Sequence, residues 1–152
     1  MLLYNSDCWQ EVSPQTIQEL ENLQLKFYRC LFAVGSGCPI PALYWQTGGT
    51  LMEYRILQKK LLFLHHVATL AEDTLAREVY EVQKTLALPG LYQECHGFLV
   101  KCGVTEVKQY SKLQWKKMVK DEIFKMNKNH LLLQIKSYKK LSYEKIPHYI
   151  EH

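Results

Sequence analysis

The chain has 152 residues, of which 47% are hydrophobic, and its formal net charge is +4. This length suits one domain, and the apolar fraction argues against a disordered chain. No run of about 18 apolar residues occurs, so we expect no membrane-spanning segment. The first residues lack the basic flank and the apolar length of a secretory signal.

The positive charge is concentrated in the last third of the chain. Residues 101–152 contain 12 Lys and five acidic residues, whereas residues 1–75 contain five basic and seven acidic ones. A basic region on a nearly neutral body favours a polyanionic partner. The alternative is that these lysines are only the solvated faces of ordinary helices.

The cysteines predict a reducing environment. There are five of them, an odd number, and no CxxC pair occurs. We therefore expect an intracellular protein, nuclear or cytoplasmic. Cys95, His96 and Cys102 could form half of a zinc site, but their spacing fits no common zinc finger and no second ligand pair follows. We expect no metal and no cofactor.

The first predicted helix covers residues 14–34. Ser13 followed by Pro14 is a typical helix start. Apolar residues recur at spacings of three and four, as on the packed side of an amphipathic helix: Ile17, Leu20, Leu23, Phe27, Leu31 and Val34. A short helix follows at residues 42–46, and the glycines at residues 48–49 then interrupt the chain.

The most apolar predicted helix covers residues 50–70. Thr50 and Glu53 offer a capping box at its start. Its second half is apolar almost all round, so we expect this half at the centre of the core. Asp73 is the expected cap of the next helix, residues 74–87. That helix carries its own apolar stripe: Leu75, Val79, Val82 and Leu86.

The C-terminal part predicts three further helices. They cover residues 91–102, residues 107–126 (with Ser111 as an alternative start) and residues 130–141. The Asn-Lys-Asn sequence at residues 127–129 is expected to separate the last two. Residues 143–152 carry no clear stop signal, which favours a truncated chain.

These elements define the expected fold. No strand pattern or hairpin turn competes with the helices. We therefore predict an all-α fold, a single irregular bundle of about six to eight helices. Residues 1–104 should form a helical core region. Residues 105–152 should form a basic helical C-terminal region that packs on the same domain.

The best functional candidate is a set of lysines in the long helix. Five lysines form it: Lys108, Lys112, Lys116, Lys117 and Lys120. Four of them recur every four residues and would make one slanting ridge, which Lys117 widens. Trp115 lies among them in sequence, and lysines beside an exposed aromatic side chain suit phosphate contacts and base stacking. Alternatively, Trp115 belongs to a packed stripe and only the basic side is solvated.

The kind of basic residue also matters. A lysine is a point charge without the planar fork of arginine, so it suits sequence-neutral contacts to phosphates rather than the reading of base edges. All three arginines lie before residue 101.

No catalytic motif occurs in the sequence. Signatures of serine hydrolases, P-loop proteins, dinucleotide-binding folds and zinc proteases are all missing. His65 and His66 adjoin, and neighbours on a helix point about 100° apart. A polar or capping role at the helix end is therefore favoured over a metal site. Asp121 and Glu122 lie among lysines, which indicates helical ion pairs.

Several segments together carry a family resemblance. Leu-Leu-Tyr-Asn-Ser-Asp-Cys-Trp at residues 2–9 precedes Leu-Glu-Asn-Leu-Gln at residues 20–24 and Phe-Tyr-Arg at residues 27–29. This order resembles the segment just after the palm in non-LTR (LINE-type) retrotransposon reverse transcriptases. Three more segments look like post-palm sequence of such elements: residues 41–66, 88–91 and 110–116.

The resemblance implies a helical thumb or post-thumb region that guides a template–primer duplex, so the partner would be RNA or an RNA–DNA duplex. The sequence lacks the paired-aspartate polymerase motif, an endonuclease domain and a Cys/His knuckle. No catalytic carboxylate can therefore be transferred, and we expect no enzymatic activity from this chain. The predicted function is weak, sequence-neutral nucleic-acid binding by a non-catalytic helical fragment.

Two other functions are compatible with the sequence. A helical protein–protein interaction module without nucleic-acid binding would self-associate through exposed apolar surface, and residues 61–64 are one candidate face. An enzyme of another type would need a pocket that contains His65, His66 or His96.

Overall fold

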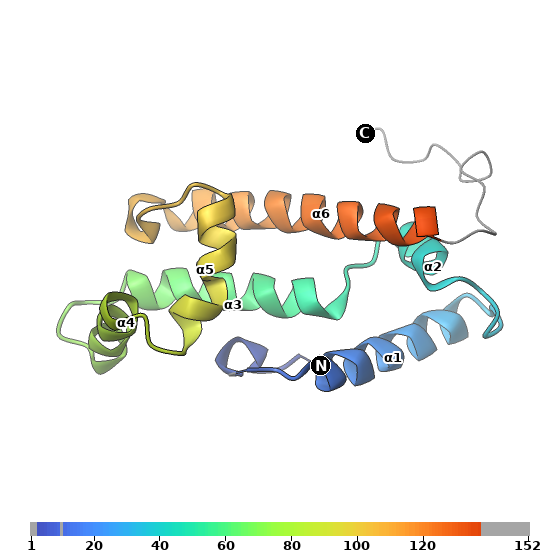
Figure 1. Ribbon diagram of the computed structural model, residues 1–152, viewed down its shortest axis with the longest axis horizontal. Coiled ribbons are helices and arrows are strands. Elements are labelled where there is room, and N and C mark those ends of the chain that lie inside the picture. Colours follow the sequence, from blue (N-terminus) through green and yellow to red (C-terminus); the bar gives the residue numbers. More distant parts are fainter. Residues whose placement is uncertain (1–2, 10, 138–152) are drawn as a thin grey trace.

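The structure is a computed structural model that describes residues 3–9 and 11–137. These residues form six α-helices and two short 3-10 helices (Figure 1): η1 (Ser6–Cys8), α1 (Pro14–Leu31), α2 (Ile40–Thr47), α3 (Met52–Ala68), α4 (Leu75–Leu86), α5 (Leu91–Lys101), η2 (Val107–Gln109) and α6 (Lys112–Ser137). No strand occurs among them, which confirms the predicted all-α bundle of about six to eight helices. In the same part of the chain, no helix is both long and apolar enough to cross a membrane.

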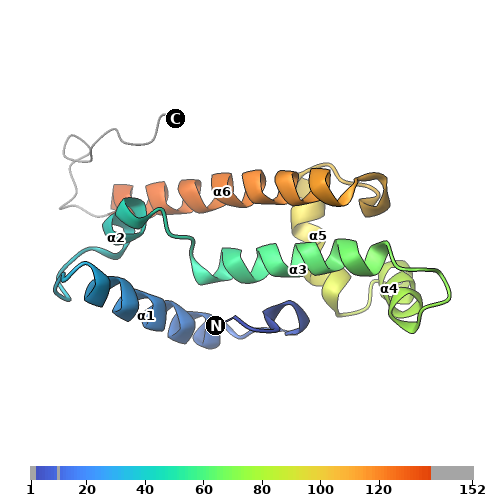
Figure 2. The ribbon, with the colours of Figure 1, turned by 180° about the vertical axis from the view of Figure 1, so that it is seen from behind.

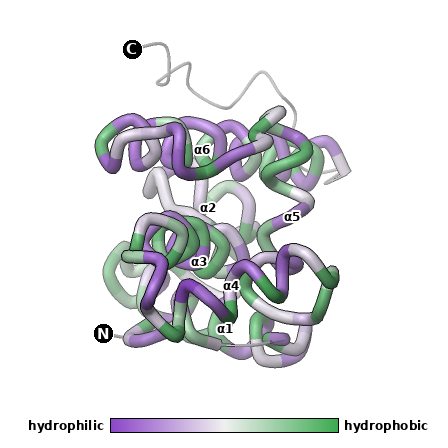
Figure 3. Tube along the Cα trace, turned by 90° about the vertical axis from the view of Figure 1, so that its left-hand side faces the viewer, coloured by the Kyte–Doolittle hydropathy of each residue, from purple (hydrophilic) through white to green (hydrophobic). Residues whose placement is uncertain are grey.

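Helix α3 lies at the centre of the bundle. Helix α6 runs antiparallel along one side of α3, and α1 lies on the opposite side (Figures 1 and 3). Helix α5 crosses from the α4 end of the molecule toward the start of α6, as the view from behind also shows (Figure 2). The basic helix therefore packs directly on the helices of the first 104 residues.

Two groups of buried apolar side chains hold the helices together. The larger core joins the second half of α3 to α4, α5 and the first half of α6, with Leu61 and Phe98 among its members. The smaller core joins α1, α2 and the second half of α6, with Leu25, Tyr44 and Leu131 among its members. The second half of α3 is thus as central as the sequence predicts.

Two of the predicted helix boundaries are confirmed by their hydrogen bonds and backbone angles. The Thr16 N–H donates to the Ser13 hydroxyl oxygen at 3.1 Å, so Ser13 caps α1. Gly48 ends α2 in the left-handed region with φ 61°. A β-carbon on Gly49 would lie 2.8 Å from Cδ1 of Tyr44, so only glycine lets the chain pass this close to α2.

Two predicted caps are wrong. Helix α3 begins after Leu51 rather than Thr50, and the Leu51 N–H donates at 3.1 Å to the Asn127 side chain of α6. Helix α4 begins after Thr74 rather than Asp73, and no side chain caps it. At α3, a group from a distant helix has taken the place of the expected local cap.

The break predicted at residues 127–129 is also wrong, because α6 continues through it as one helix. Asn127 is buried and faces the loop before α3. Its Oδ1 accepts the Leu51 N–H, and its Nδ2 donates to the Gly49 carbonyl, both at 3.1 Å. These tertiary bonds outweigh the low helix propensity of asparagine. The predicted end of the last helix and the segment after it, residues 138–152, lie outside the described residues.

Helix α4 turns its apolar stripe toward solvent. Its four stripe residues are exposed: Leu75, Val79, Val82 and Leu86. Instead, α4 buries Tyr80 and Arg77. The Arg77 guanidinium donates to the Ala68 carbonyl and to Glu81, and it lies 5.1 Å from the centroid of the Tyr80 ring. An arginine can occupy the core side because backbone, carboxylate and aromatic partners compensate its desolvation.

Helix α1 shows the same inversion. Leu23, Phe27 and Leu31 are exposed, although their spacing is typical of a packed stripe. The buried residues of α1 are Gln24 and Leu25. Gln24 is held in place because its Nε2 donates to the Tyr44 hydroxyl at 2.8 Å and to a carbonyl of the loop before α3. In α1, too, a polar side chain with partners has replaced an expected apolar contact.

Candidate nucleic-acid interface

Reciprocal hydrogen bonds fix the residue at which the basic helix α6 begins. The Gln114 N–H donates to the Ser111 hydroxyl at 3.3 Å, and the Ser111 N–H donates to Oε1 of Gln114 at 3.0 Å. This reciprocal pair is a capping box. It decides between the two predicted starts, and Lys112 is the first helical residue.

Trp115 does not take part in a stacking surface, so this site prediction is wrong. Its side chain is only 1% exposed, and its Nε1 donates to the Leu61 carbonyl at 2.9 Å. The indole anchors α6 on α3, and it has no free face for a base. The alternative role, a packed tryptophan beneath a solvated basic side, is the one that the structure shows.

His65 helps to hold the same end of α6, a role that the sequence did not reveal. Its Nε2 donates to the Tyr110 carbonyl at 2.9 Å. Its ring stacks on the Trp115 indole, with centroids 5.7 Å apart and planes 23° apart. The predicted capping of its own helix end is replaced by contacts to a segment 45 residues away in sequence. The neighbouring His66 is exposed.

Four of the predicted lysines form the exposed basic surface of α6: Lys112, Lys116, Lys117 and Lys120. We call three of them, Lys112, Lys116 and Lys120, the lysine row. Residues four apart on a helix lie above one another with a rise of about 6 Å. All three are exposed, and so is Lys117 beside them. None of the four forms a salt bridge with another described residue. Their charges are therefore free to attract an anionic partner.

Lys108 does not belong to the lysine row, which corrects the prediction of one ridge. It lies in η2, and the extended backbone of Tyr110 (φ −92°, ψ 134°) separates η2 from α6. Its Nζ lies 3.6 Å from Oε1 of Glu81 in α4. The four-residue spacing fails here because the cap at Ser111 starts a new helix.

The row continues with an aromatic residue that the sequence prediction overlooked. Phe124 follows Lys120 by four residues and is 53% exposed, and Lys128 follows by another four. Lys128 Nζ lies 5.9 Å from the centroid of the Trp45 ring of α2. Phe124, Trp45 and Lys128 border one shallow depression. The spacing of the lysines could have identified Phe124, but no sequence signal joins Trp45 to α6.

The sequence predicts helical ion pairs for the two acidic residues of α6, and the structure shows one for Glu122. Lys125 Nζ lies 2.5 Å from Oε1 of Glu122, three residues away. Asp121 is exposed and forms no salt bridge within the described residues. The helix remains basic, with seven lysines and two acids between Lys112 and Ser137.

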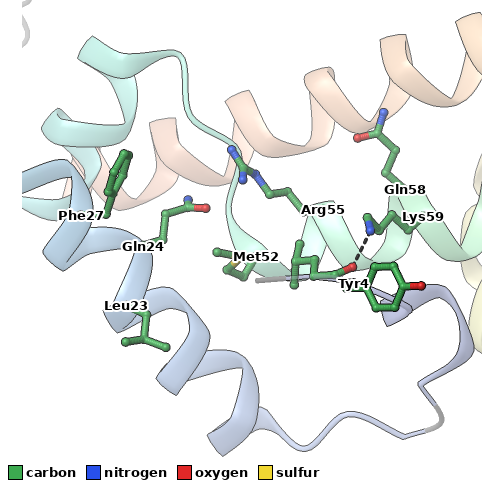
Figure 4. Close-up of a pocket in the computed structure, with 9 residues that line it drawn as sticks. Tyr4, Leu23, Gln24, Phe27, Met52, Arg55, Gln58 and Lys59 are labelled. Atoms are coloured by element: carbon green, nitrogen blue, oxygen red, sulfur yellow. Dashed lines mark hydrogen bonds between the residues drawn. The ribbon is translucent and has the colours of Figure 1, made fainter. Parts of the chain in front are cut away.

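A separate hollow of about 780 Å³ lies between α1, α3 and the segment before η1, on the side of α3 that faces away from α6 (Figure 4). Its wall combines Leu23 and Phe27 of α1 with Arg55 and Lys59 of α3. Gln24 also borders it, and the Oε1 of this buried residue has no hydrogen-bond partner. The hollow can therefore accept an apolar group and offers polar atoms beside it, but it contains none of the predicted site residues.

Within the part of the chain that the structure describes, the potential metal ligands do not gather at a common point. Burial raises the pKa of the Cys95 thiol to about 12, so the thiolate that a metal needs is disfavoured. No group of three His, Cys, Asp or Glu in residues 3–9 and 11–137 could hold a metal ion. Neither the hollow beside α1 nor a second one beside α4 contains a histidine. In comparisons with known proteins, no family model, no curated protein and no solved structure matches this chain.

Proposed function

We propose that the chain is a non-catalytic helical module that binds nucleic acid without sequence preference. Its partner would be RNA or an RNA–DNA duplex, as the resemblance to the region after the palm of retroelement reverse transcriptases implies. The observation that carries the proposal is the exposed lysine row, which forms no salt bridges within the described residues and ends at an exposed aromatic side chain.

The proposed contacts follow from the geometry of α6. Lysines rising by about 6 Å per step along a rigid helix present a line of positive charge to a phosphate backbone. Lysine ammonium groups do not read base edges, so binding would be weak and independent of sequence. Phe124 and Trp45 replace Trp115 as the aromatic side chains on which an unpaired base could stack.

The first prediction tests this surface by charge reversal. In the triple variant Lys112→Glu, Lys116→Glu and Lys120→Glu, the affinity for a short RNA–DNA hybrid should fall more than tenfold. The slope of log affinity against log salt should fall by about three, because each phosphate contact contributes about 0.9. Fluorescence anisotropy across a salt series measures both quantities.

A matched control separates the row from net charge. Lys26, Lys101 and Lys136 are exposed and lie outside the lysine row, and their triple reversal to Glu changes the net charge by the same amount. The control should retain most of the wild-type affinity. Equal losses in the two triple variants would mean that only overall charge matters, and the interface would then be wrongly assigned.

The second candidate function is a protein-interaction module that also self-associates. The face expected at residues 61–64 cannot serve, because Leu61 and Leu64 are completely buried. The exposed apolar side chains of α1 and α4 favour this function instead. Sedimentation at increasing concentration tests self-association, and a monomer at all concentrations would contradict it.

We also propose an intracellular location, nuclear or cytoplasmic. All five cysteines are free. Burial raises the pKa of the Cys95 thiol and also that of the Cys102 thiol. Free thiols of this kind are usual in reducing compartments. A fluorescent fusion found in the secretory pathway would contradict this part of the proposal.

A further inference from the structure

The outer face of α4 has an unusual arrangement for an exposed surface. Four apolar residues are spaced by four, three and four positions along the helix: Leu75, Val79, Val82 and Leu86. This spacing places them on one side of the helix, as in a coiled-coil seam. Leu75 is 74% exposed and Leu86 is 62% exposed, so nothing in the described residues covers the seam.

The seam has the same residues in both directions. It reads Leu-Val-Val-Leu from either end, and its spacing of four, three and four is also symmetric. A two-fold axis places residue i of one copy against residue j of the other and j against i, so a seam with this symmetry pairs leucine with leucine and valine with valine. We propose that α4 pairs antiparallel with α4 of a second copy of this chain. Leu75 then faces Leu86 of the second copy, and Val79 faces Val82 of the second copy.

The residues that flank the seam do not oppose this arrangement. They are Ala76 and Gln83 on one side and Glu78 and Thr85 on the other. In an antiparallel pair, each side meets the same side of its partner. Glu78 then approaches Thr85 of the second copy, and no two like charges are opposed. The charged residues Arg77 and Glu81 are bound to each other within one chain.

A hollow beside α4 offers room for the partner's side chains. It has a volume of about 400 Å³ and is mainly apolar, and its lining includes Leu75 and Val79 of α4 together with Trp9 and Phe63. In the antiparallel register, Leu86 of the second copy lies next to Leu75 and thus at the edge of this hollow. Insertion of this leucine would give the pair a knob and a hole rather than two flat surfaces.

The size of the seam predicts a weak dimer. Four partly exposed aliphatic side chains represent apolar surface on the order of a few hundred Å² per copy. A standard stable interface buries about 800 Å² per partner. We therefore expect a dissociation constant in the micromolar to millimolar range. Sedimentation equilibrium should detect the dimer only as the protein concentration is raised.

This inference rests on the second proposed function and is independent of nucleic-acid binding. Two single variants test the position of the interface. Val79→Glu should remain monomeric at concentrations at which the wild-type chain dimerises, because a charge would be buried at the seam centre. Phe27→Glu places the same charge on α1, where Phe27 is 63% exposed, and should dimerise like the wild type. Loss of dimers in Phe27→Glu with retention in Val79→Glu would overturn the α4 assignment.

A mixing experiment tests the antiparallel register. Val82→Lys alone should also be monomeric. When Val79→Glu and Val82→Lys are mixed, Glu at position 79 of one copy faces Lys at position 82 of the other, and the remaining central pair is native. A heterodimer should therefore form more tightly than the homodimer of either variant, because the buried charge now has an opposite partner. No heterodimer would overturn the register, whereas a wild-type monomer would overturn both self-association and this inference. Unchanged circular dichroism in each variant excludes unfolding as the cause.

Discussion

Buried polar side chains decide the local structure at several points of this molecule. Asn127 supports the start of α3, His65 holds the segment before α6, and Gln24 joins α1 to α2. In each case the partner lies at least 20 residues away in sequence. Buried polar groups need such partners, because an unpaired one costs about 1–3 kcal/mol. Their positions therefore depend on the tertiary fold and not on local propensity.

Replacement of Asn127 provides a direct test of this dependence. In Asn127→Ala, the buried Leu51 N–H and Gly49 carbonyl lose their side-chain partners. We expect the free energy of unfolding to fall by about 2 kcal/mol, after a small gain from the better helix propensity of alanine. Urea denaturation measures this difference.

The matched control lies two residues further along α6. Asn129 is exposed, so Asn129→Ala should change only helix propensity and should raise stability by less than about 0.7 kcal/mol. If the two variants are equally stable, the bonds of Asn127 to the loop before α3 contribute nothing, and the continuity of α6 needs another explanation.

Glu21 provides a pH-dependent test at the same scale. Its Oε2 accepts the Met52 N–H at the start of α3 at 2.7 Å, while burial raises its pKa above the usual 4.5. The folded chain therefore holds this proton more tightly than the unfolded chain. Stability must then fall as the pH rises through 4.5 toward the folded-state pKa.

Glu21→Gln keeps an acceptor for Met52 but cannot ionise. Its stability relative to the wild type should therefore be higher at pH 7 than well below pH 4.5, where the wild-type carboxyl is protonated. Urea denaturation at the two pH values measures the change. Glu19→Gln, an exposed change on the same helix, is the control. If the difference in stability between Glu21→Gln and the wild type is the same at both pH values, burial does not raise the pKa of Glu21.

At the scale of the elements, the sequence predicts the positions of helices better than the directions of their faces. Gly48 and Gly49 end α2 and Ser13 begins α1, because glycine angles and hydroxyl caps act locally. The stripe of α4 carries the same pattern as a packed helix, yet it faces solvent. Periodicity shows that a helix has two sides, but the contacts of other helices decide which side is buried.

The candidate interface was predictable to a similar degree. The spacing of Lys112, Lys116 and Lys120 needs only one continuous helix, and the structure provides it. Lys108 falls within the predicted ridge because the sequence alone does not distinguish a capping box at Ser111 from a helix that starts earlier. The sequence also predicts Trp115 as part of the site, because an aromatic residue next to lysines in sequence can lie on either side of a helix. On a helix, Trp115 and Lys116 point about 100° apart, so one can be buried while the other is exposed.

At the scale of the whole molecule, the two cores divide the bundle into unequal ends. The larger core contains four helices, whereas α1 and α2 depend on a smaller group of buried side chains around Leu25 and Tyr44. Helix α1 also leaves Leu23, Phe27 and Leu31 of its apolar stripe exposed. Regions with few buried apolar contacts open at lower free energy than the rest of a protein. The α1–α2 end should therefore open without unfolding the larger core.

Native-state hydrogen exchange can resolve the two ends. The amides of α1 and α2 should exchange with a lower opening free energy than those of α5 and the first half of α6. Leu25→Ala should reduce protection mainly in α1 and α2. Leu99→Ala, a change of the same kind in the larger core, should reduce protection throughout, since each removes about 2–5 kcal/mol of buried contacts. Equal opening free energies at both ends would show a single cooperative unit. The lysine row lies on the first half of α6, which packs in the larger core, so local opening of α1 and α2 would leave Lys112, Lys116 and Lys120 on an intact helix while Trp45 moves away from Lys128. Nucleic-acid affinity should accordingly change little in Leu25→Ala.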